Sequence, residues 1–179
     1  MPGGVLTQAE LDMLMALFGQ SMPRQKRTAD AGKKVAVLKE TLETRAALWA
    51  AAFEAKSGYP ATVTLRTILR VKRVEVEETE ILVKESGTAH YFIMPAALVN
   101  LVNERSLGAF ETLPMLSHPL SAIDRALFLS TGDFLSKGLL LAQPGQLPQK
   151  QRMIEAHFDV ALKPLLRTTM RMVMPDELL

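Results

Sequence analysis

Residues 79–94, TEILVKESGTAHYFIM, contain two runs rich in β-branched and aromatic side chains with a turn between them. The runs cover 79–84 and 88–94, and the connecting Glu85-Ser86-Gly87 supplies the glycine that a tight hairpin favours. Upstream, apolar and polar residues alternate over 63–71, which predicts another strand with one buried face. The sequence therefore predicts an antiparallel sheet of at least three strands.

Helical periodicity occurs on both sides of these strands. Apolar residues at three- and four-residue steps over 35–56 predict a long amphipathic helix, which Gly58 and Pro60 end. Its apolar face contains Val35, Leu38, Leu42, Ala46, Trp49 and Phe53. After the hairpin, Pro95 suits the first turn of a helix through 95–102 that stops near Gly108. The predicted fold class is α+β, with a small, mostly antiparallel sheet covered by helices.

The C-terminal third gives weaker signals. Ser121 and Asp124 predict the start of a helix that runs to about residue 142. Residues 150–162 predict a further helix, whereas 166–174 fit a strand or a helix equally well.

Near 72–74, after the first predicted strand, the alternation of apolar and polar residues is interrupted, so we expect a β-bulge or a bend there.

Length and composition narrow the class of protein. The 179 residues suit one domain, and 48% hydrophobic with 22% charged residues is a globular composition. The net charge of +2 is too small to indicate nucleic acid or an anionic membrane as partner. No cysteine is present, which excludes disulfides and thiolate metal sites. We expect a cytoplasmic protein without membrane insertion, because no apolar run approaches about 20 residues and no signal-peptide pattern occurs.

Signatures of catalysis and of metal or cofactor binding are missing. His90, His118 and His157 each stand without a second ligand at a known metal-motif spacing, and no phosphate-binding or nucleophile motif occurs. The acidic cluster of Glu75, Glu77, Glu78 and Glu80 is more typical of a solvated strand edge than of a cation site. We therefore expect no metal, no cofactor and no enzymatic activity.

Basic residues gather in two places. Arg66, Arg70 and Lys72 are predicted to share one strand face, and 20–34 contains five more cations. No aromatic residues for base stacking lie among them, so a nucleic-acid adaptor is a disfavoured alternative.

Residues 5–18 predict a short amphipathic helix, because Thr7 and Glu10 have capping-box spacing ahead of an apolar side. A helix of this length is marginal in water unless its apolar face docks on another surface. The segment therefore packs on its own domain or binds a second protein, and the sequence leaves both open. The candidate partner-binding residues are Leu6, Glu10, Leu11, Asp12, Leu14, Met15 and Phe18. The predicted organisation is a tethered peptide over 1–19, a basic linker over 20–34 and an α+β domain over 35–179.

Residues 6–15, LTQAELDMLM, resemble the N-terminal segment of the FliM family of flagellar motor-switch proteins, whose pattern is L-S-Q-x-E-I-D-x-L-L. In that family the phosphorylated response regulator CheY binds this segment, which precedes a flexible linker and a middle domain. Residues 92–102, FIMPAALVNLV, with Leu107-Gly108, resemble a strand, helix and glycine turn of the middle domain. Residues 118–125, HPLSAIDR, are similar to its Thr-x-x-Glu helix start. The resemblance implies a non-enzymatic component of a flagellar motor switch or a chemotaxis adaptor that recruits a response regulator.

The chain departs from the family at two places. The family has a paired-glycine loop where this chain has only Gly108, which weakens the expectation that it binds the switch protein FliG. The related CheC-type phosphatases use a Glu-x-x-Asn pair, and neither Asn100 nor Asn103 has a glutamate three residues before it. A CheC-like phosphatase is thus the enzymatic alternative, which requires Asn100 or Asn103 beside a carboxylate such as that of Glu104. The sequence leaves homo-oligomer formation open.

Overall fold

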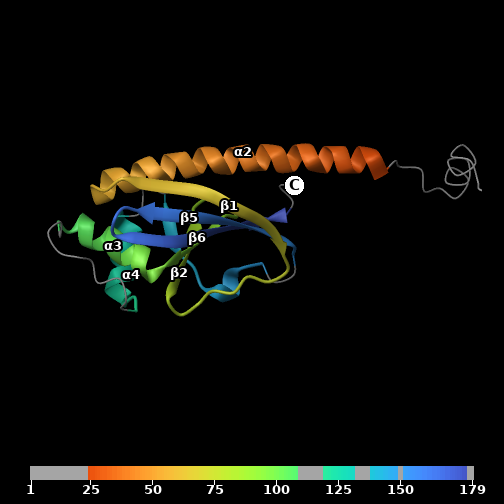
Figure 1. Cartoon of the computed structure of the whole chain (residues 1–179). Coiled ribbons are helices and arrows are strands. Elements are labelled where there is room, and N and C mark those ends of the chain that lie inside the picture. Colours follow the sequence, from red (N-terminus) through yellow and green to blue (C-terminus); the bar gives the residue numbers. More distant parts are fainter. Residues whose placement is uncertain (1–23, 109–118, 132–137, 149–150, 177–179) are drawn as a thin grey trace, which may run out of the picture. The chain divides into compact units, whose positions relative to one another are not determined.

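The structure is a computed structural model, and it describes residues 24–108, 119–131, 138–148 and 151–176 (Figure 1). The chain divides into two units, Met1–Leu38 with Leu179 and Lys39–Leu178. Helix α2 (Arg24–Ser57) runs through the boundary between them. It begins before residue 35, within the stretch expected to be a linker. The architecture below is that of the second unit.

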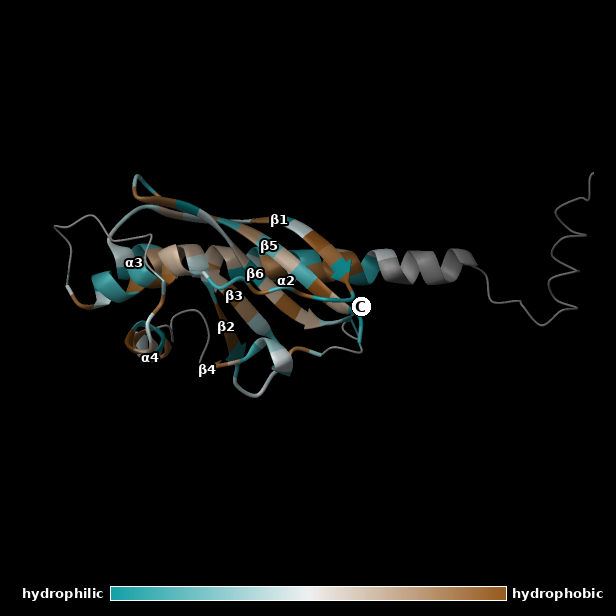
Figure 2. Ribbon diagram, turned by 90° about the horizontal axis from the view of Figure 1, so that it is seen from below, coloured by the Kyte–Doolittle hydropathy of each residue, from teal (hydrophilic) through white to brown (hydrophobic). Residues whose placement is uncertain are grey.

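A six-stranded antiparallel sheet forms the centre of this unit, in the order β1-β5-β6-β3-β2-β4 (Figures 1 and 2). The strands are β1 (Ala61–Val71), β2 (Glu80–Glu85), β3 (Tyr91–Pro95), β4 (Leu139–Leu141), β5 (Met153–Leu162) and β6 (Leu166–Pro175). The predicted hairpin is confirmed, since β2 and β3 pair from Glu80↔Pro95 to Lys84↔Tyr91. Gly87 in its turn has a φ of 74°, a conformation that glycine adopts without steric cost.

One sheet face packs against the second half of α2 (Figure 1). Leu42, Ala46, Trp49 and Phe53 are all at most 3% exposed, as their three- and four-residue spacing predicts. The Trp49 ring meets the rings of two sheet residues edge-on, with centroid distances of 5.6 Å to Phe92 and 5.1 Å to Phe158. These contacts join α2 to β3 and β5 in the main core.

The opposite sheet face carries a smaller apolar cluster beneath two connecting segments. One is residues 72–79, between β1 and β2, and the other is residues 142–148, between β4 and β5. The cluster contains Leu82, Tyr91, Ile93, Ala142, Leu147, Met153 and Val173, with Val71, Val74 and Val76 packed against it. The two segments therefore cover part of this face, and the space between them forms the candidate site.

Two helices complete the unit. Helix α3 (Ala96–Ser106) directly follows β3, and Gly108 after it has a φ of 85°, as expected of a glycine stop. Helix α4 (Ala122–Thr131) begins with a reciprocal cap, in which Ser121 N donates to Asp124 Oδ2 (2.8 Å) and Asp124 N donates to Ser121 Oγ (3.2 Å). The sequence prediction of both helix starts is confirmed, and the fold class is α+β.

One predicted helix is wrong, and the predicted extent of another is too long. Residues 150–162 contain strand β5 instead, and the helix expected to reach residue 142 gives way to strand β4 at Leu139–Leu141. In β5, Ile154, Phe158 and Leu162 fit a four-residue step, but they also belong to a two-residue step that the helical interpretation overlooked. The ambiguous stretch 166–174 lies in strand β6.

The bend expected near 72–74 is confirmed, because strand β1 ends at Val71 and the chain bends at Lys72. A second irregularity, which the sequence did not indicate, lies earlier in the strand. The register of β1 against β5 shifts between Leu65 and Thr67, so Arg66 is the extra residue. Because a bulge reverses the alternation after it, Arg66 and Arg70 lie on opposite faces of the sheet. Arg66 is 3.8 Å from Asp159, whereas Arg70 is 3.0 Å from Asp176. The expected shared basic face is therefore wrong.

Candidate protein-binding site

The predicted partner-binding residues lie outside the described residues, since all of them precede residue 24. They are Leu6, Glu10, Leu11, Asp12, Leu14, Met15 and Phe18. Their role stays a prediction. Among the described residues, the strongest candidate site is a cavity that the sequence did not indicate.

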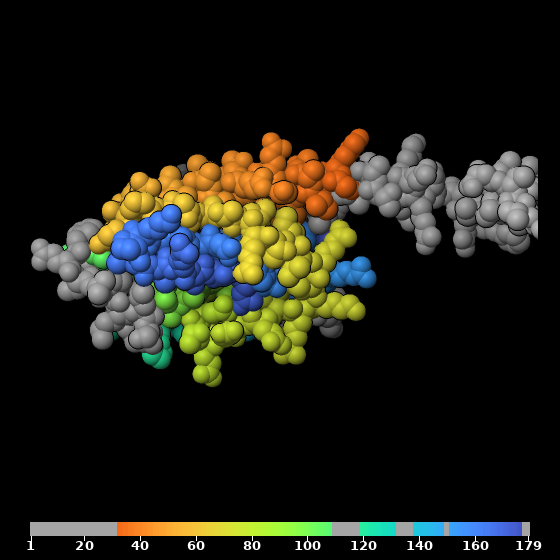
Figure 3. Space-filling model, in the orientation of Figure 1, coloured from red at the N-terminus to blue at the C-terminus, as the bar shows by residue number. Residues whose placement is uncertain are grey.

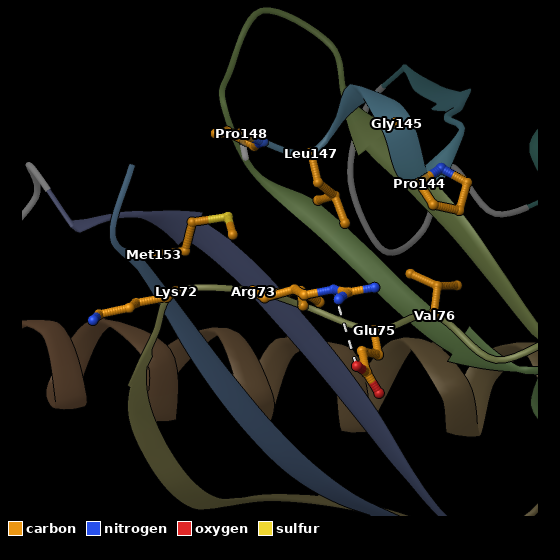
Figure 4. Close-up of a pocket in the computed structure, with 10 residues that line it drawn as sticks. Lys72, Arg73, Glu75, Val76, Pro144, Gly145, Leu147, Pro148 and Met153 are labelled. Atoms are coloured by element: carbon orange, nitrogen blue, oxygen red, sulfur yellow. Dashed lines mark ion pairs between the residues drawn. The ribbon is translucent and has the colours of Figure 1, made fainter. Parts of the chain in front are cut away.

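A cavity of about 660 Å³ opens between the two segments that cover the second sheet face (Figure 4). One wall is residues 72–76, and the other includes the short 3₁₀ helix η2 (Pro144–Gln146) and residues 147–148. Leu147 and Met153, which are 5% and 2% exposed, give it an apolar lining. Its volume lies within the range of about 300–1,000 Å³ that is common for ligand pockets.

Two cations, Lys72 and Arg73, give the cavity a positively charged rim. Arg73 Nε lies 4.0 Å from Glu75 Oε1, and both side chains are more than 80% exposed, at 84% and 82% (Figure 4). An ion pair this exposed stabilises a protein by less than about 1 kcal/mol. The Arg73 guanidinium can therefore exchange Glu75 for a ligand carboxylate at little cost.

Arg171 on β6 holds the first wall in place. Its guanidinium lies 2.6 Å from Glu80 Oε2 and 2.8 Å from Glu155 Oε1, and it donates to the Glu75 carbonyl at 2.9 Å. The side chains of Arg171, Glu80 and Glu155 are only 17%, 13% and 8% exposed. For Glu80 the expected solvated edge is therefore wrong, because this carboxylate belongs to a shielded ion cluster.

Hydrogen bonds also hold the second wall. The Tyr91 hydroxyl donates to the Gln146 carbonyl at 3.1 Å, and Ala142 N donates to the Leu82 carbonyl at 2.9 Å. Tyr91 and Leu82 belong to β3 and β2, so this wall is tied to the sheet beneath it. Both walls are thus attached to the rigid sheet without a ligand.

The residues of the phosphatase alternative lie elsewhere, in α3. Asn100 and Asn103 are 2% and 3% exposed, and Asn103 Nδ2 donates to the Asp124 carbonyl at 2.8 Å. This bond joins α3 to α4. Amides buried to this degree suit a packing role better than the positioning of a water molecule on a partner's phosphate.

Next to this bond, two large apolar side chains are exposed. Leu107 follows α3 and is 72% exposed, while Ile123 in the first turn of α4 is 79% exposed. They lie close in sequence to Asn103 and Asp124, which connect the helices. The α3–α4 end of the domain therefore has two exposed apolar side chains.

Each described histidine lies near a carboxylate. His90 Nδ1 is within hydrogen-bond distance of Glu85 Oε2, at 2.8 Å, whereas His157 Nε2, on β5, lies 3.4 Å from Glu155 Oε1 without hydrogen-bond geometry. His118 falls outside the described residues. Within the described part of the chain, no three histidine, aspartate or glutamate residues form a group that could hold a metal ion. None of the helices there is both long and apolar enough to cross a bilayer.

Comparison with known proteins identifies solved structures with a similar fold. No family model matches the sequence, and no curated protein matches it. Among solved structures, a chain of the FliG-FliM complex from H. pylori has a TM-score of 0.63 at 8% identity, covering 80% of this chain and 93% of that one. The FliM middle domain from H. pylori has a TM-score of 0.56 at 8% sequence identity, and the match covers 80% of this chain and 92% of that one. FliY from Thermotoga maritima has a TM-score of 0.60 at 10% sequence identity, and the match covers 82% of this chain and 91% of that one. The fold is thus similar to that of FliM and FliY, which confirms the fold that the resemblance implied.

Proposed function

We propose that this protein is a non-enzymatic, protein-binding component of the flagellar motor-switch type, which recruits a response-regulator partner through its N-terminal segment. One observation carries the proposal: a domain with the fold of FliM follows a segment, residues 6–15, that resembles the regulator-binding peptide of that family. The order of the two parts agrees with the family, although sequence identity in the domain is only 8% to the H. pylori proteins.

The chemistry of the segment supports this role. In a helix, Leu11, Leu14, Met15 and Phe18 fall on one side, so they can fill an apolar groove on the partner. Glu10 and Asp12 lie outside that side and stay in water or meet cations at the groove's edge. Leu6 precedes the cap, where it can staple against Leu11.

A second protein partner is supported at the α3–α4 end of the domain. One of the similar FliM structures is a complex with FliG, and we propose that a protein of this switch-component type contacts the α3–α4 end here. The exposed Leu107 and Ile123 supply the apolar contacts. Since Gly108 stands where the family has paired glycines, the expectation that this partner is FliG itself is weakened.

A peptide titration tests the recruitment. A peptide of residues 1–20 is titrated with a CheY-type regulator activated by beryllofluoride, which mimics phosphorylation. We expect saturable binding that is weaker with the unactivated regulator. The matched control peptide carries Leu11→Ala and Leu14→Ala, and should lose binding because it loses the apolar side. Absence of binding at millimolar concentration refutes the proposal.

A further inference from the structure

The cavity between residues 72–76 and 144–148 has a chemistry that the proposed function does not use. It combines a buried apolar lining, from Leu147 and Met153, with exposed cations at its rim. The segment 72–79, whose first five residues form one wall, lies at the surface (Figure 3). A ligand that fits must therefore carry an apolar group next to negative charge.

The wall formed by residues 72–76 favours a peptide over a compact molecule. Val74 and Val76 pack against the apolar cluster, whereas Arg73 and Glu75 are exposed, so side chains alternate as in a strand. Yet this segment lies outside the sheet, and no backbone hydrogen bond joins Val74 or Val76 to another described residue. An extended peptide alongside it can pair with these backbone groups.

The charged residues at the rim of the cavity indicate which peptide charge is favoured. Lys72 is exposed at one end of the cavity, and Arg73 extends along it towards Glu75 (Figure 4). Glu75 is the single acidic residue among those that line the cavity, so cations outnumber anions there. Carboxylates of an incoming peptide complement this surplus, and lysines or arginines would be repelled.

We propose that this cavity binds an extended, acidic segment of a partner protein, with a large apolar side chain against Leu147 and Met153 and carboxylates beside Lys72 and Arg73. The residues that line this cavity belong neither to the N-terminal segment nor to the α3–α4 end. This binding therefore holds or fails independently of the function proposed above. Both walls are already attached to the sheet, by Arg171 and by Tyr91, so little ordering is needed on binding.

Gly145 offers a variant of the cavity lining. A Cβ added there meets nothing within 4 Å. Its φ is not positive, so a larger residue is tolerated by the backbone. Gly145→Leu therefore adds a large side chain to the lining without a clash at its Cβ. Lys72→Glu with Arg73→Glu reverses the rim, and Arg167→Glu is a charge-reversal control at a single exposed residue of β6.

The probe is the fluorescein-labelled, amidated peptide EDLFDE, added to the full-length protein and followed by fluorescence anisotropy. We expect saturable binding that weakens with salt and falls by about tenfold or more for the isosteric neutral peptide QNLFNQ. Gly145→Leu and the double Glu variant should lose binding, and Arg167→Glu should keep it. Equal binding of both peptides, binding unchanged by Gly145→Leu, or displacement by octanoate at the same concentration as by unlabelled peptide each overturns the proposal, the last in favour of a small-molecule site. Far-UV circular dichroism confirms that each variant is folded.

Discussion

The guanidinium of Arg171 lies 2.6 Å from the carboxylate of Glu80, a residue 91 positions earlier in the chain. The same guanidinium binds Glu155 on the neighbouring strand β5 and the backbone of Glu75 in the segment above the sheet. One side chain thus joins β6, β5, β2 and the cavity wall. The position of the wall formed by residues 72–76 therefore depends on this one half-buried cation.

Replacement of Arg171 by Met should destabilise the protein by roughly 2–4 kcal/mol, because it leaves the shielded Glu155 and Glu80 carboxylates without their cation. The measurement is the free energy of unfolding in urea. Arg66→Gln is the control, since Arg66 lies 3.8 Å from Asp159 with side chains 65% and 57% exposed. It should change stability by less than about 0.5 kcal/mol. Equal losses for the two variants contradict the assigned role of Arg171.

Adjacent residues on α2 give a second test. Trp49→Ala should cost about 3–5 kcal/mol, because Trp49 is 3% exposed and packs on Phe92 and Phe158. Leu48→Ala should cost no more than about 0.5 kcal/mol, because Leu48 is 66% exposed. Urea unfolding of both variants measures the difference. A Leu48 variant as unstable as the Trp49 variant would mean that the helix face is assigned wrongly.

Gly138 and Gly145 should differ in their tolerance of substitution by alanine. Gly138 has a φ of 72°, and an added Cβ would lie 3.0 Å from the Cβ of Ser86, so Gly138→Ala should lose about 1–2 kcal/mol. Gly145→Ala meets no neighbour within 4 Å, and it should be neutral or stabilise by up to about 1 kcal/mol. Thermal unfolding followed by circular dichroism compares the two. The same loss at both positions would refute the described conformation of Gly138, the residue before β4.

Asn103→Ala distinguishes a packing role from a catalytic one. The variant loses the 2.8 Å bond to the Asp124 carbonyl and should destabilise the protein by about 1–3 kcal/mol. Ser130→Ala, at an exposed position of α4, should stay within about 0.5 kcal/mol. Dephosphorylation of a regulator is assayed in parallel. Unchanged stability together with lost dephosphorylation would instead support the phosphatase alternative.

Local signals in the sequence were sufficient for several elements. The β2–β3 hairpin and the cap formed by Ser121 and Asp124 depend on residues within a few positions of each other, and both were predicted. Strand β5 was not, because Ile154, Phe158 and Leu162 satisfy helical and strand periods alike. Pairing with β1 and β6 selects the strand.

The cavity had no signal in the sequence. Its walls come from residues 72–76 and 144–148, which meet only because β4 pairs with β2 and β5 pairs with β1. Arg171 is not part of a sequence motif. Glu80 belongs to a cluster of glutamates, and such clusters are usually exposed to solvent. Burial and long-range pairing, rather than spacing, give these residues their roles. The N-terminal site differs from the cavity, since the evidence for it comes entirely from the sequence.

Calorimetric titration of the full-length chain with a beryllofluoride-activated CheY-type regulator tests the central claim most directly, with a chain lacking residues 1–19 measured alongside. We predict a dissociation constant below about 1 mM for the full chain and no detectable heat for the shortened one. Equal binding by the shortened chain, or no binding by the folded full chain, would contradict recruitment through the N-terminal segment.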